Sequence, residues 1–402
     1  MKKIVFLTII IIVTLAFGEK SSACTSAIIT GKATPDGRPL MWKHRDTDKE
    51  NNRIVYSQGV KYSYIGLVNS DDVNNSEIWA GTNSAGFCIM NTASYNMKAA
   101  NDSTKVKDRE GIIMRMALEC CATVEDFEHF LDTIAKPSGI EANFGVIDAG
   151  GGAAYYETNN FIRKKYDANN PEFAPNNYII RTNYSYSGRE DEGMGYIRHE
   201  NAKYLFENHQ TQKFTPDLIL SSISRSYYHS LLECDLQTQL PSLTIDQDYI
   251  PRNSSSASIV FQGVKKGDPV ERTTMWTVLG FPPCGIVVPL WVAGGEHLPE
   301  IMTKTDTGNN APLCDKVVAL KNKVFPIKRG NGYKYMNFSL LYNEAGDGIM
   351  QKLQLPEKEI FEETYQKMDD RNTSFWSEKN INDYYKYLNN KIIKIYYDLF
   401  GL

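Results

Sequence analysis

The sequence predicts an α+β protein in which helices cover antiparallel sheet, and three observations support this prediction. Short strand-like runs occur in pairs, and turn residues that favour a hairpin join each pair. Two helical patterns follow each other closely, as expected for an antiparallel helix pair that covers a sheet. From Pro356 to Leu402 the chain is polar and mostly helical, which predicts a helical C-terminal extension over residues 356–402, packed on the outside.

Residues 1–23 have the layout of a secretory signal peptide. A basic start is followed by an unbroken apolar run from Ile4 to Phe17 and then by small residues up to Ala23. The run is too short to span a bilayer comfortably as a permanent helix. We therefore expect cleavage after Ala23, export to the periplasm or the outside of a bacterial cell, and a mature chain 24–402 that forms a single domain.

Cleavage after Ala23 would make Cys24 the first residue, with a thiol and a free α-amine on one residue. The reference pKa of an α-amine is about 7.7–8.0, so it can act as general base for its own side chain near neutral pH. The thiol has a reference pKa of about 8.5, which a nearby cation lowers. Cys24 is therefore the candidate nucleophile.

Two different interpretations of Cys24 stay open. It could be the acylated cysteine of a surface lipoprotein, but Ser21 stands where the bacterial lipid signal usually has a Leu-like residue. A lipoprotein cysteine also usually opens a flexible polar tether, whereas Thr25–Thr30 is typical of a buried strand. An ordinary disulfide cysteine is disfavoured by the position at the cleavage site.

The first hairpin brings charged residues next to Cys24. Pro35-Asp36-Gly37 predicts a turn between Thr25–Thr30 and Leu40–Lys43, because proline presets φ and glycine supplies positive φ. The end of the second strand then lies beside the start of the first. Asp46, or a charged neighbour, should lie beside Cys24, where a carboxylate can hold the α-amine and a cation favours the thiolate. Alone, these charges would indicate only a solvated strand end.

Strands and helices follow in order along the rest of the chain. Strand-like stretches occur within Ile54–Val68, and Glu77–Thr92 predicts a strand, a tight turn and a strand, with Asn91 projecting into a cleft or making a strand-end hydrogen bond. Asp108–Cys121 has helical spacing. Thr123 and Asp126 then resemble a capping box for a helix to about Ala135.

The later part of the chain continues the pattern. Asn143–Glu157 predicts a hairpin that turns on glycines, and Tyr178–Tyr184 predicts a strand whose end carries Asn183. A helix is expected from about Gly195, with Arg198 in its first turn. Further strands are predicted over Ser254–Gln262 and Thr273–Leu279.

Composition excludes several classes of function. The chain has 402 residues, 42% hydrophobic and 23% charged, which is enough for a sizeable core. Its net charge is −4 without a dense Lys/Arg stripe, which argues against nucleic acid as a partner. After the signal no apolar run is long enough to cross a membrane. Homo-oligomerisation stays open.

The histidines and cysteines indicate no metal or cofactor. The six histidines show none of the spacings typical of metal sites, so we expect no catalytic metal and no cofactor. Without Cys24 six cysteines remain, which could pair in an oxidising compartment, but their spacing supports no disulfide framework. The adjacent Cys120 and Cys121 fall in a helical pattern, where packing is the expected role.

Several short segments, taken in order, resemble a known superfamily. They are Cys24-Thr-Ser, the Pro-Asp-Gly hairpin up to Asp46, Gly81–Gly86 leading to Asn91, Asn143–Asp148, Arg181-Thr-Asn183 and Tyr196-Ile-Arg198. The superfamily is that of the N-terminal-nucleophile (Ntn) hydrolases acting on linear amides, with choloylglycine hydrolase, penicillin V acylase and isopenicillin acyltransferase-like proteins. The resemblance extends from Cys24 to Pro289, and it implies a four-layer αββα sandwich of two antiparallel sheets between helical layers.

The resemblance also implies roles for individual residues. Cys24 would be the nucleophile and its own base, and Asp46 would hold the α-amine. Asn91 and Asn183 would supply the oxyanion hole and orient the amine, and Arg198 would match an arginine of the family.

One position departs from the family pattern. Lys43 stands three residues before Asp46, where the family often has arginine. Lysine keeps the charge but not the planar fork of arginine. Lys43 could therefore activate the thiol with a different geometry, or Arg45 could take this part.

These observations favour an exported hydrolase that cleaves a linear, non-peptide carbon–nitrogen bond in a small-molecule amide through a thioester acyl-enzyme. An acyltransferase uses the same residues and differs only in what enters the acyl-enzyme. A dipeptidase of the N-terminal-cysteine class and a non-enzymatic lipoprotein acylated on Cys24 also stay open. The sequence does not identify the substrate among bile-salt conjugates, penicillins, N-acyl amino acids and dipeptides.

Overall fold

The computed structural model describes residues 23–98, 102–369 and 373–402. The expected signal peptide, apart from its last residue Ala23, lies outside the described residues. In the part that the structure describes, no helix combines the length and the apolar character needed to cross a membrane.

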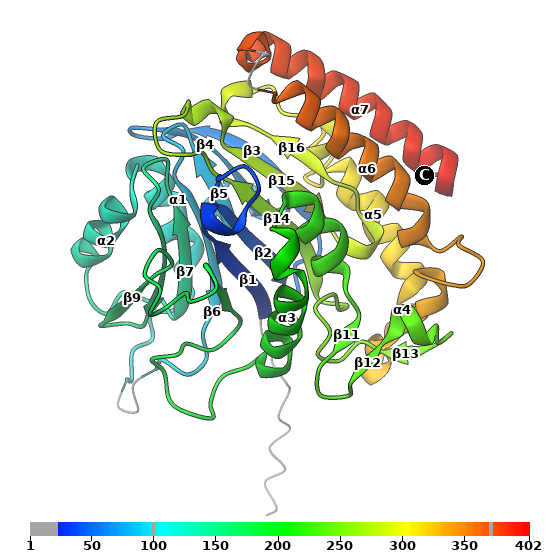
Figure 1. Cartoon of the computed structure of the whole chain (residues 1–402), viewed down its shortest axis with the longest axis horizontal. Coiled ribbons are helices and arrows are strands. Elements are labelled where there is room, and N and C mark those ends of the chain that lie inside the picture. The colour runs from blue at the N-terminus through cyan, green and yellow to red at the C-terminus, as the bar shows by residue number, and fades with distance from the viewer. Residues whose placement is uncertain (1–22, 99–101, 370–372) are drawn as a thin grey trace, which may run out of the picture.

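Two antiparallel sheets lie face to face at the centre of the protein (Figure 1). The six-stranded sheet has the order β10 (Tyr178–Arg181), β1 (Ala23–Ile29), β2 (Leu40–Asp46), β14 (Ser255–Gln262), β15 (Thr274–Leu279) and β16 (Val288–Leu290). The seven-stranded sheet runs in chain order from β3 (Asn52–Gln58) through β4 (Ser63–Asn69), β5 (Ala80–Asn83), β6 (Cys88–Ala93), β7 (Ala142–Ile147) and β8 (Ala153–Thr158) to β9 (Arg163–Asp167).

Helices cover the outer faces of both sheets (Figure 1). The helices α1 (Glu110–Cys120) and α2 (Val124–Thr133) pack on the seven-stranded sheet. The other side carries α3 (Tyr196–His209), α5 (Pro312–Val324), α6 (Ile349–Lys367) and α7 (Glu378–Phe400). The expected four-layer αββα arrangement is therefore confirmed.

Alternation along the strands explains the layers. In β8, Tyr155 points between the sheets, where its hydroxyl lies 2.9 Å from Oγ of Ser26 on β1. The next residue, Tyr156, points the other way and donates to Glu128 of α2. Successive strand side chains face opposite sides of a sheet, so one strand supplies both the inter-sheet core and the core under the helices.

The predicted first hairpin and the predicted capping box are both present. In the β1–β2 pair, Cys24 lies opposite Arg45 and Ala23 opposite Asp46. Thr123 caps α2, because its side chain accepts from the backbone of Asp126 and the Asp126 carboxylate accepts from the backbone of Thr123. Both features depend on local sequence.

The C-terminal helices differ in one boundary from the expectation. Helix α6 begins at Ile349, so that Pro356, the expected start of the extension, lies inside it. Proline removes one helical hydrogen bond and usually ends a helix. Here Leu353 and Phe361 on either side are buried in the core, and this packing keeps the helix continuous.

The smaller elements include the two-stranded sheets β11 (Tyr228–His229) with β12 (Cys234–Asp235) and β13 (Thr244–Ile245) with β17 (Tyr335–Met336), and the short helix α4 (Leu236–Gln239).

Candidate active site

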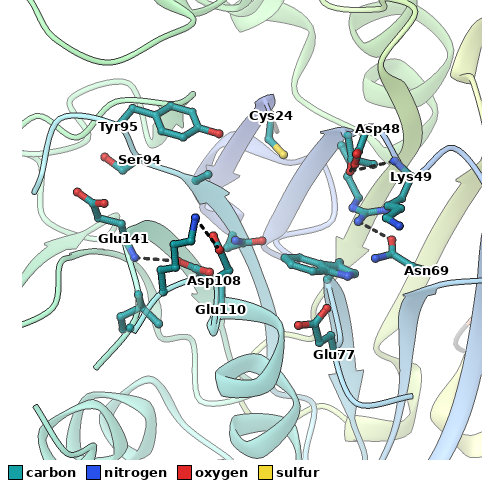
Figure 2. A pocket seen from close by; sticks show the side chains of 18 of the residues that line it. Cys24, Asp48, Lys49, Asn69, Glu77, Ser94, Tyr95, Asp108, Glu110 and Glu141 are labelled. Carbon is teal, nitrogen blue, oxygen red and sulfur yellow. Dashed lines mark hydrogen bonds and ion pairs between the residues drawn. The ribbon is translucent and has the colours of Figure 1, made fainter. Parts of the chain in front are cut away.

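Cys24 lies near the start of β1 and lines a cavity of about 760 Å³ between the two sheets and the N-terminal end of α1. Its side chain is 4% exposed, and Figure 2 shows the sulfur pointing into this cavity. Lys43, Arg45, Trp79 and Asn91 line the same cavity. All seven cysteines of the chain lie in the described part and are free thiols.

The backbone nitrogen of Cys24 is held by Asn183. It donates to Oδ1 of Asn183 over 2.7 Å, and Nδ2 of Asn183 donates to the carbonyl of Ala93 over 2.9 Å. The oxygen of Asn183 therefore faces Cys24 while its nitrogen is engaged elsewhere. This geometry favours orientation of the amine, rather than the oxyanion hole, as the part that Asn183 can play.

Arg198 completes the contacts to the backbone of Cys24. Its guanidinium donates to the Cys24 carbonyl over 2.6 Å, to Oγ1 of Thr25 over 3.0 Å and to Oδ1 of Asn183 over 2.7 Å. Gly195 makes room for it, because a Cβ at this position would lie 2.2 Å from a guanidinium nitrogen. Gly195 also has φ +81°, which favours glycine.

The loop that carries Asn183 is anchored on both sides by Asn143 of β7. Nδ2 of Asn143 donates to the carbonyls of Thr182 and Tyr184, and its Oδ1 accepts from Oγ of Ser185. Asn143 is fully buried, so these bonds form in an environment without competing water. They fix the backbone on each side of Asn183.

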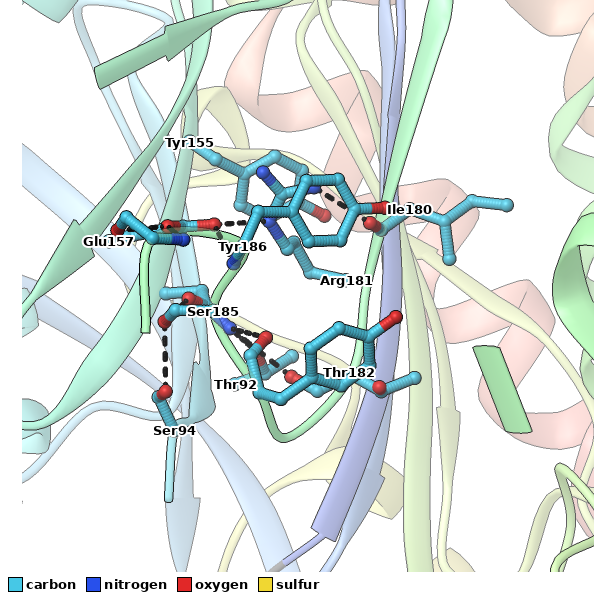
Figure 3. A network of polar contacts seen from close by, with 12 residues as sticks. Thr92, Ser94, Tyr155, Glu157, Ile180, Arg181, Thr182, Ser185 and Tyr186 are labelled. Carbon is cyan, nitrogen blue, oxygen red and sulfur yellow. Dashed lines mark hydrogen bonds and ion pairs between the residues drawn. The ribbon is translucent and has the colours of Figure 1, made fainter. Parts of the chain in front are cut away.

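A second anchor of the same loop is the buried ion pair of Arg181 and Glu157 (Figure 3). Nε of Arg181 lies 3.0 Å from the Glu157 carboxylate, and the guanidinium stacks 3.6 Å from the ring centre of Tyr186. Glu157 also accepts from the backbone nitrogens of Tyr186 and Ser187. No pattern in the sequence indicates this pair, because its members are joined only by the sheet-to-sheet packing.

Lys43 and Asn91 form a hydrogen-bonded pair next to Cys24. Nζ of Lys43 donates to Oδ1 of Asn91 over 2.8 Å and to the carbonyl of Trp79 over 2.5 Å. Both acceptors are neutral, and the lysine is 1% exposed. Because the ammonium orients the amide oxygen, Nδ2 of Asn91 is left as a donor, and it has no partner among the described residues.

The pKa of Lys43 reflects this environment. It is lowered to about 7, mainly by burial; the anionic form of Cys24 opposes this shift, and the nearby charge of Arg45 adds to it. No ion pair to Lys43 is present in the described part of the chain. The thiolate of Cys24 is thus the anion placed to balance its charge.

Arg45 reaches the same cavity from the next position on that face of β2. It donates to the amide oxygens of Asn52 and Asn69, and its guanidinium lies 5.2 Å from the ring centre of Trp79. Burial lowers its pKa to about 10, and it remains a cation near neutral pH. Lys43 and Arg45 both lie near Cys24, but only Lys43 contacts Asn91.

Asp46 lies opposite Ala23, at the strand end where removal of Ala23 would release the α-amine. Its carboxylate accepts from Oγ of Ser255 over 2.5 Å and from the guanidinium of Arg252. Burial alone would raise the pKa of Asp46, but Arg252, His44 and Ser255 keep it below its usual value. Asp46 is therefore a buried anion; its role in holding the α-amine stays a prediction.

The structure thus places Asn183 and Arg198 in hydrogen-bond contact with Cys24, Lys43 and Asn91 in the lining of the same cavity, and Asp46 at the adjoining strand end. Sequence reasoning missed Arg252 and Ser255. They immediately precede or begin β14, which pairs with β2, but no local pattern predicts this pairing. Within the described part of the chain, no group of three or more His, Cys, Asp or Glu side chains is arranged to hold a metal ion.

A comparison with protein families finds a match over part of the chain. Residues 34–229 match the family described as acyl-coenzyme A:6-aminopenicillanic acid acyl-transferase. The match includes the positions of Lys43, Asp46, Asn91, Asn183 and Arg198 but begins after Cys24. A search of curated protein sequences gives no match.

Solved structures of low sequence identity are also similar to this chain. An N-acylethanolamine-hydrolyzing acid amidase ortholog from Caenorhabditis elegans is 15% identical, with a TM-score of 0.41 over 60% of this chain and 92% of that one. A mutant of conjugated bile acid hydrolase from Clostridium perfringens is 10% identical, with a TM-score of 0.40 over 64% and 89%. Penicillin V acylase from Agrobacterium tumefaciens is 12% identical, with a TM-score of 0.36 over 67% and 86%.

These structural similarities are too low to carry an argument about activity. The family match and the two-sheet architecture agree with the resemblance found in the sequence. Residues 34–229, somewhat less than half of the chain, match this family model, and the two-sheet architecture is that of the Ntn-hydrolase fold.

Proposed function

We propose that this protein is an exported amide hydrolase whose mature first residue, Cys24, cleaves a linear, non-peptide carbon–nitrogen bond through a thioester. The observation that carries the proposal is the pair of contacts at Cys24: its thiol lines a cavity, while Asn183 holds the nitrogen that cleavage after Ala23 would turn into the α-amine. The leader would be removed on export to the periplasm or the outside of the cell.

The surroundings of the nitrogen suit a neutral amine. Asn183 offers an oxygen acceptor, which leaves the lone pair of a neutral amine available for the thiol proton. Arg198 donates to the same oxygen and to the Cys24 carbonyl, and its positive charge disfavours a second positive charge on the amine. Removal of Ala23 vacates the position opposite Asp46, whose carboxylate would meet the ammonium once it forms.

In the first half of the reaction, the α-amine of Cys24 takes the thiol proton and the sulfur attacks the amide carbonyl carbon. The electron pair of the carbonyl moves to its oxygen, and Nδ2 of Asn91 donates to this oxyanion. One such donor is typically worth about 2.7–4 kcal/mol of transition-state stabilisation. The carbon–nitrogen bond then breaks, and the leaving amine takes the proton from the ammonium of Cys24.

In the second half, water attacks the thioester and gives its proton to the α-amine. The carbon–sulfur bond breaks, the acid leaves, and the sulfur regains its proton. Lys43 supports both halves, because its charge favours the thiolate and its hydrogen bond directs the amide of Asn91.

The experiment begins with the intact mass of the exported protein. The proposal predicts a chain that starts at Cys24 and carries no lipid. Incubation with N-acyl amino acids, bile-salt conjugates, penicillin V and dipeptides should add an acyl mass on Cys24 for the true substrate, and hydroxylamine should remove it. Cys24→Ala should abolish both turnover and the adduct. A diacylglycerol on Cys24 would instead identify a lipoprotein, and turnover by Cys24→Ala would refute covalent catalysis.

Acyl transfer is the second candidate, since the family that matches residues 34–229 is described as an acyl-transferase. The same thioester would then be resolved by an acceptor amine in place of water. Partition measurements separate the two: a transferase forms new amide in proportion to added amine, whereas a hydrolase releases the free acid at a rate that the amine hardly changes.

A further inference from the structure

The carboxylate of Asp46 lies where the mature chain would begin. Asp46 is the last residue of β2 and is fully buried. In the β1–β2 pair it lies opposite Ala23, and in the β2–β14 pair it lies opposite Ser255. Cleavage after Ala23 would therefore leave the α-amine of Cys24 beside a buried anion.

A lone carboxylate at this place would oppose the proposed general base. An opposite charge within about 4–6 Å favours the charged form of a group, and between Asp and Arg it shifts a pKa by about 1–3 units. The reference pKa of an α-amine is about 7.7–8.0, so a rise of one unit would lower its neutral fraction at pH 7 by about tenfold. Only the neutral amine has the lone pair that accepts the thiol proton. The carboxylate therefore needs a cation of its own if the amine is to act as a base near neutral pH.

A tight turn at the start of β14 supplies two partners for this carboxylate. The backbone nitrogen of Ser255 donates to the carbonyl of Arg252 over 2.8 Å, and the backbone nitrogen of Arg252 donates to Oγ of Ser255 over 2.9 Å. The guanidinium of Arg252 donates to Oδ2 of Asp46, and Oγ of Ser255 donates to Oδ1 over 2.5 Å. Residues of one turn thus engage both carboxylate oxygens.

The turn itself is held in place by neighbouring loops. The backbone nitrogen of Asn253 donates to the carboxylate of Asp246 over 2.6 Å, and its Nδ2 donates to the carbonyl of Tyr333 over 2.6 Å. The side chain of Arg252 is 17% exposed and that of Asp46 is 0% exposed. A buried, anchored ion pair interacts more strongly than a mobile surface pair. The guanidinium is therefore a fixed cation at Asp46.

Two further groups near Asp46 do not take the part of Arg252. Burial disfavours the anion of Asp46, and among the charges that outweigh burial Arg252 comes first, ahead of His44 and Arg198. His44 lies 3.8 Å from the carboxylate, but burial lowers its pKa to about 4, so it is neutral near pH 7. Arg198 of α3 donates instead to the carbonyl of Cys24.

Two more acidic residues act on Arg252. Burial opposes the charge of the guanidinium, but the carboxylates of Asp46, Asp246 and Asp248 outweigh it and raise the pKa of Arg252. Burial raises the pKa of Asp246 to about 6, so this residue is also ionised where an α-amine titrates. The charges of the pair and its surroundings are therefore constant while the amine changes its own.

We propose that Arg252 is a positioning residue for the α-amine of Cys24: its ion pair keeps the Asp46 carboxylate from trapping the amine as an ammonium, yet leaves this carboxylate in place for the ammonium that forms during turnover. This inference rests on the proposed function, since it concerns the base of that same reaction. A structural role explains why a buried carboxylate has a partner. It does not require the partner to set the protonation of a group on the neighbouring strand, and this effect can be measured.

The pH profile of the mature enzyme gives the first measurement, with a substrate found in the acyl-enzyme screen. Arg252→Gln removes the cation and keeps a polar side chain. The rise of kcat/KM with pH should move to higher pH by about one unit, so that activity falls about tenfold at pH 7 and the deficit shrinks as the pH rises. Arg252→Lys keeps the charge and should return this rise to within about 0.3 unit of wild type. A loss of the same size at every pH, or a rise that does not move, would overturn the inference.

The pKa of the amine can also be measured without turnover, in the Cys24→Ala protein released from a tag so that residue 24 comes first. Labelling with [15N]alanine gives one amine signal, because every other alanine nitrogen is an amide, and no thiol at residue 24 titrates with it. Lys43, whose pKa is also near neutral, is common to all variants. Adding Arg252→Gln should raise the pKa of this amine by about one unit. Adding Asp46→Asn, which leaves Arg252 without its carboxylate, should lower it, and this measurement decides alone if Arg252→Gln does not fold.

Arg163→Gln is the matched control. Arg163 of β9 also pairs with carboxylates, those of Glu128 and Asp132, but β9 is an edge strand of the seven-stranded sheet. This change should alter neither the pH profile nor the pKa of the amine. The predicted pKa shifts without any turnover by wild type would support the role of Arg252 and contradict the hydrolase. Turnover by wild type with an amine pKa that the changes at Arg252 and Asp46 leave unmoved would overturn the inference while the hydrolase stands.

Discussion

Replacing Lys43 with methionine should stabilise the folded protein while it impairs the chemistry. Methionine is unbranched and close to the lysine stem in shape, so the change removes the buried ammonium with little loss of packing. The ammonium is costly because the side chain is buried and both of its hydrogen-bond acceptors are neutral. The variant therefore separates the cost of the charge from the packing of the site.

The magnitude follows from the pKa of Lys43. Burial lowers it from 10.5 to about 7. At about 1.4 kcal/mol per pH unit, this difference costs the folded state about 5 kcal/mol when the lysine is charged in both states. Loss of two hydrogen bonds, about 1 kcal/mol each, offsets part of the gain. We expect Lys43→Met to raise the free energy of unfolding by about 3 kcal/mol at pH 6.

The lowered pKa of Lys43 also determines how stability changes with pH. Because the folded-state pKa is lower than the unfolded one, the folded protein holds fewer protons between about pH 7 and 10.5. The stability of wild type thus rises with pH in this window. Below the window, the full free-energy cost of the buried Lys43 ammonium is present. The advantage of Lys43→Met should be largest at pH 6, shrink above pH 7 and disappear near pH 10.5.

Urea unfolding followed by tryptophan fluorescence at a series of pH values measures this difference. Lys32→Met is the control, since Lys32 is exposed at the other end of the same hairpin and should change stability by less than about 0.5 kcal/mol. Two results would contradict this reasoning: Lys43→Met is no more stable than wild type at pH 6, or the difference in their free energies of unfolding does not change with pH. Either result would mean that the buried ammonium does not destabilise the folded protein.

Three further predictions concern the reaction. Cys24→Ser should keep the fold, judged by circular dichroism, and lose at least about 10²-fold in kcat, because the α-amine must then deprotonate a much weaker acid; an equally active serine enzyme would contradict the thiolate mechanism. Asn91→Ala should lower kcat by about 10²–10³ with little change in KM, as expected for an oxyanion donor, and an unchanged kcat would remove Asn91 from the site. Asn183→Asp places a carboxylate beside the α-amine and favours its protonated form, so the rise of kcat/KM that accompanies loss of this proton should move to higher pH. An unchanged pH profile would contradict the assignment of Asn183 as the residue that holds the α-amine.

The sequence predicted best those features that depend on neighbouring residues. The hairpin from Cys24 to Asp46 was predicted from its Pro-Asp-Gly turn, and the cap of α2 from Thr123 and Asp126. The prediction left open whether Asp46 or a charged neighbour lies beside Cys24, and the hairpin places Arg45 opposite Cys24 and Asp46 opposite Ala23. Strand alternation fixes which side a residue faces, but a shift of one position exchanges the partners.

Contacts between distant segments escaped prediction. Glu110 appeared only as part of a helical pattern, and its place in the cavity depends on how α1 packs against the sheet. Arg252 pairs with Asp46 only because β14 lies beside β2, across more than 200 residues of chain. The resemblance to the Ntn hydrolases could supply the nucleophile and its neighbours, but not these partners.

Catalysis by the α-amine of Cys24 can be tested with two proteins that differ by one residue at the N-terminus. One is released from a cleavable tag so that Cys24 comes first, and the other keeps a single glycine before Cys24. Both retain the thiol, but only the first has the α-amine of Cys24 at Asn183. With a substrate found in the acyl-enzyme screen, the proposed mechanism predicts turnover by the first protein and a loss of at least about 10³-fold in the second. Equal turnover by the two proteins would contradict catalysis by an N-terminal nucleophile.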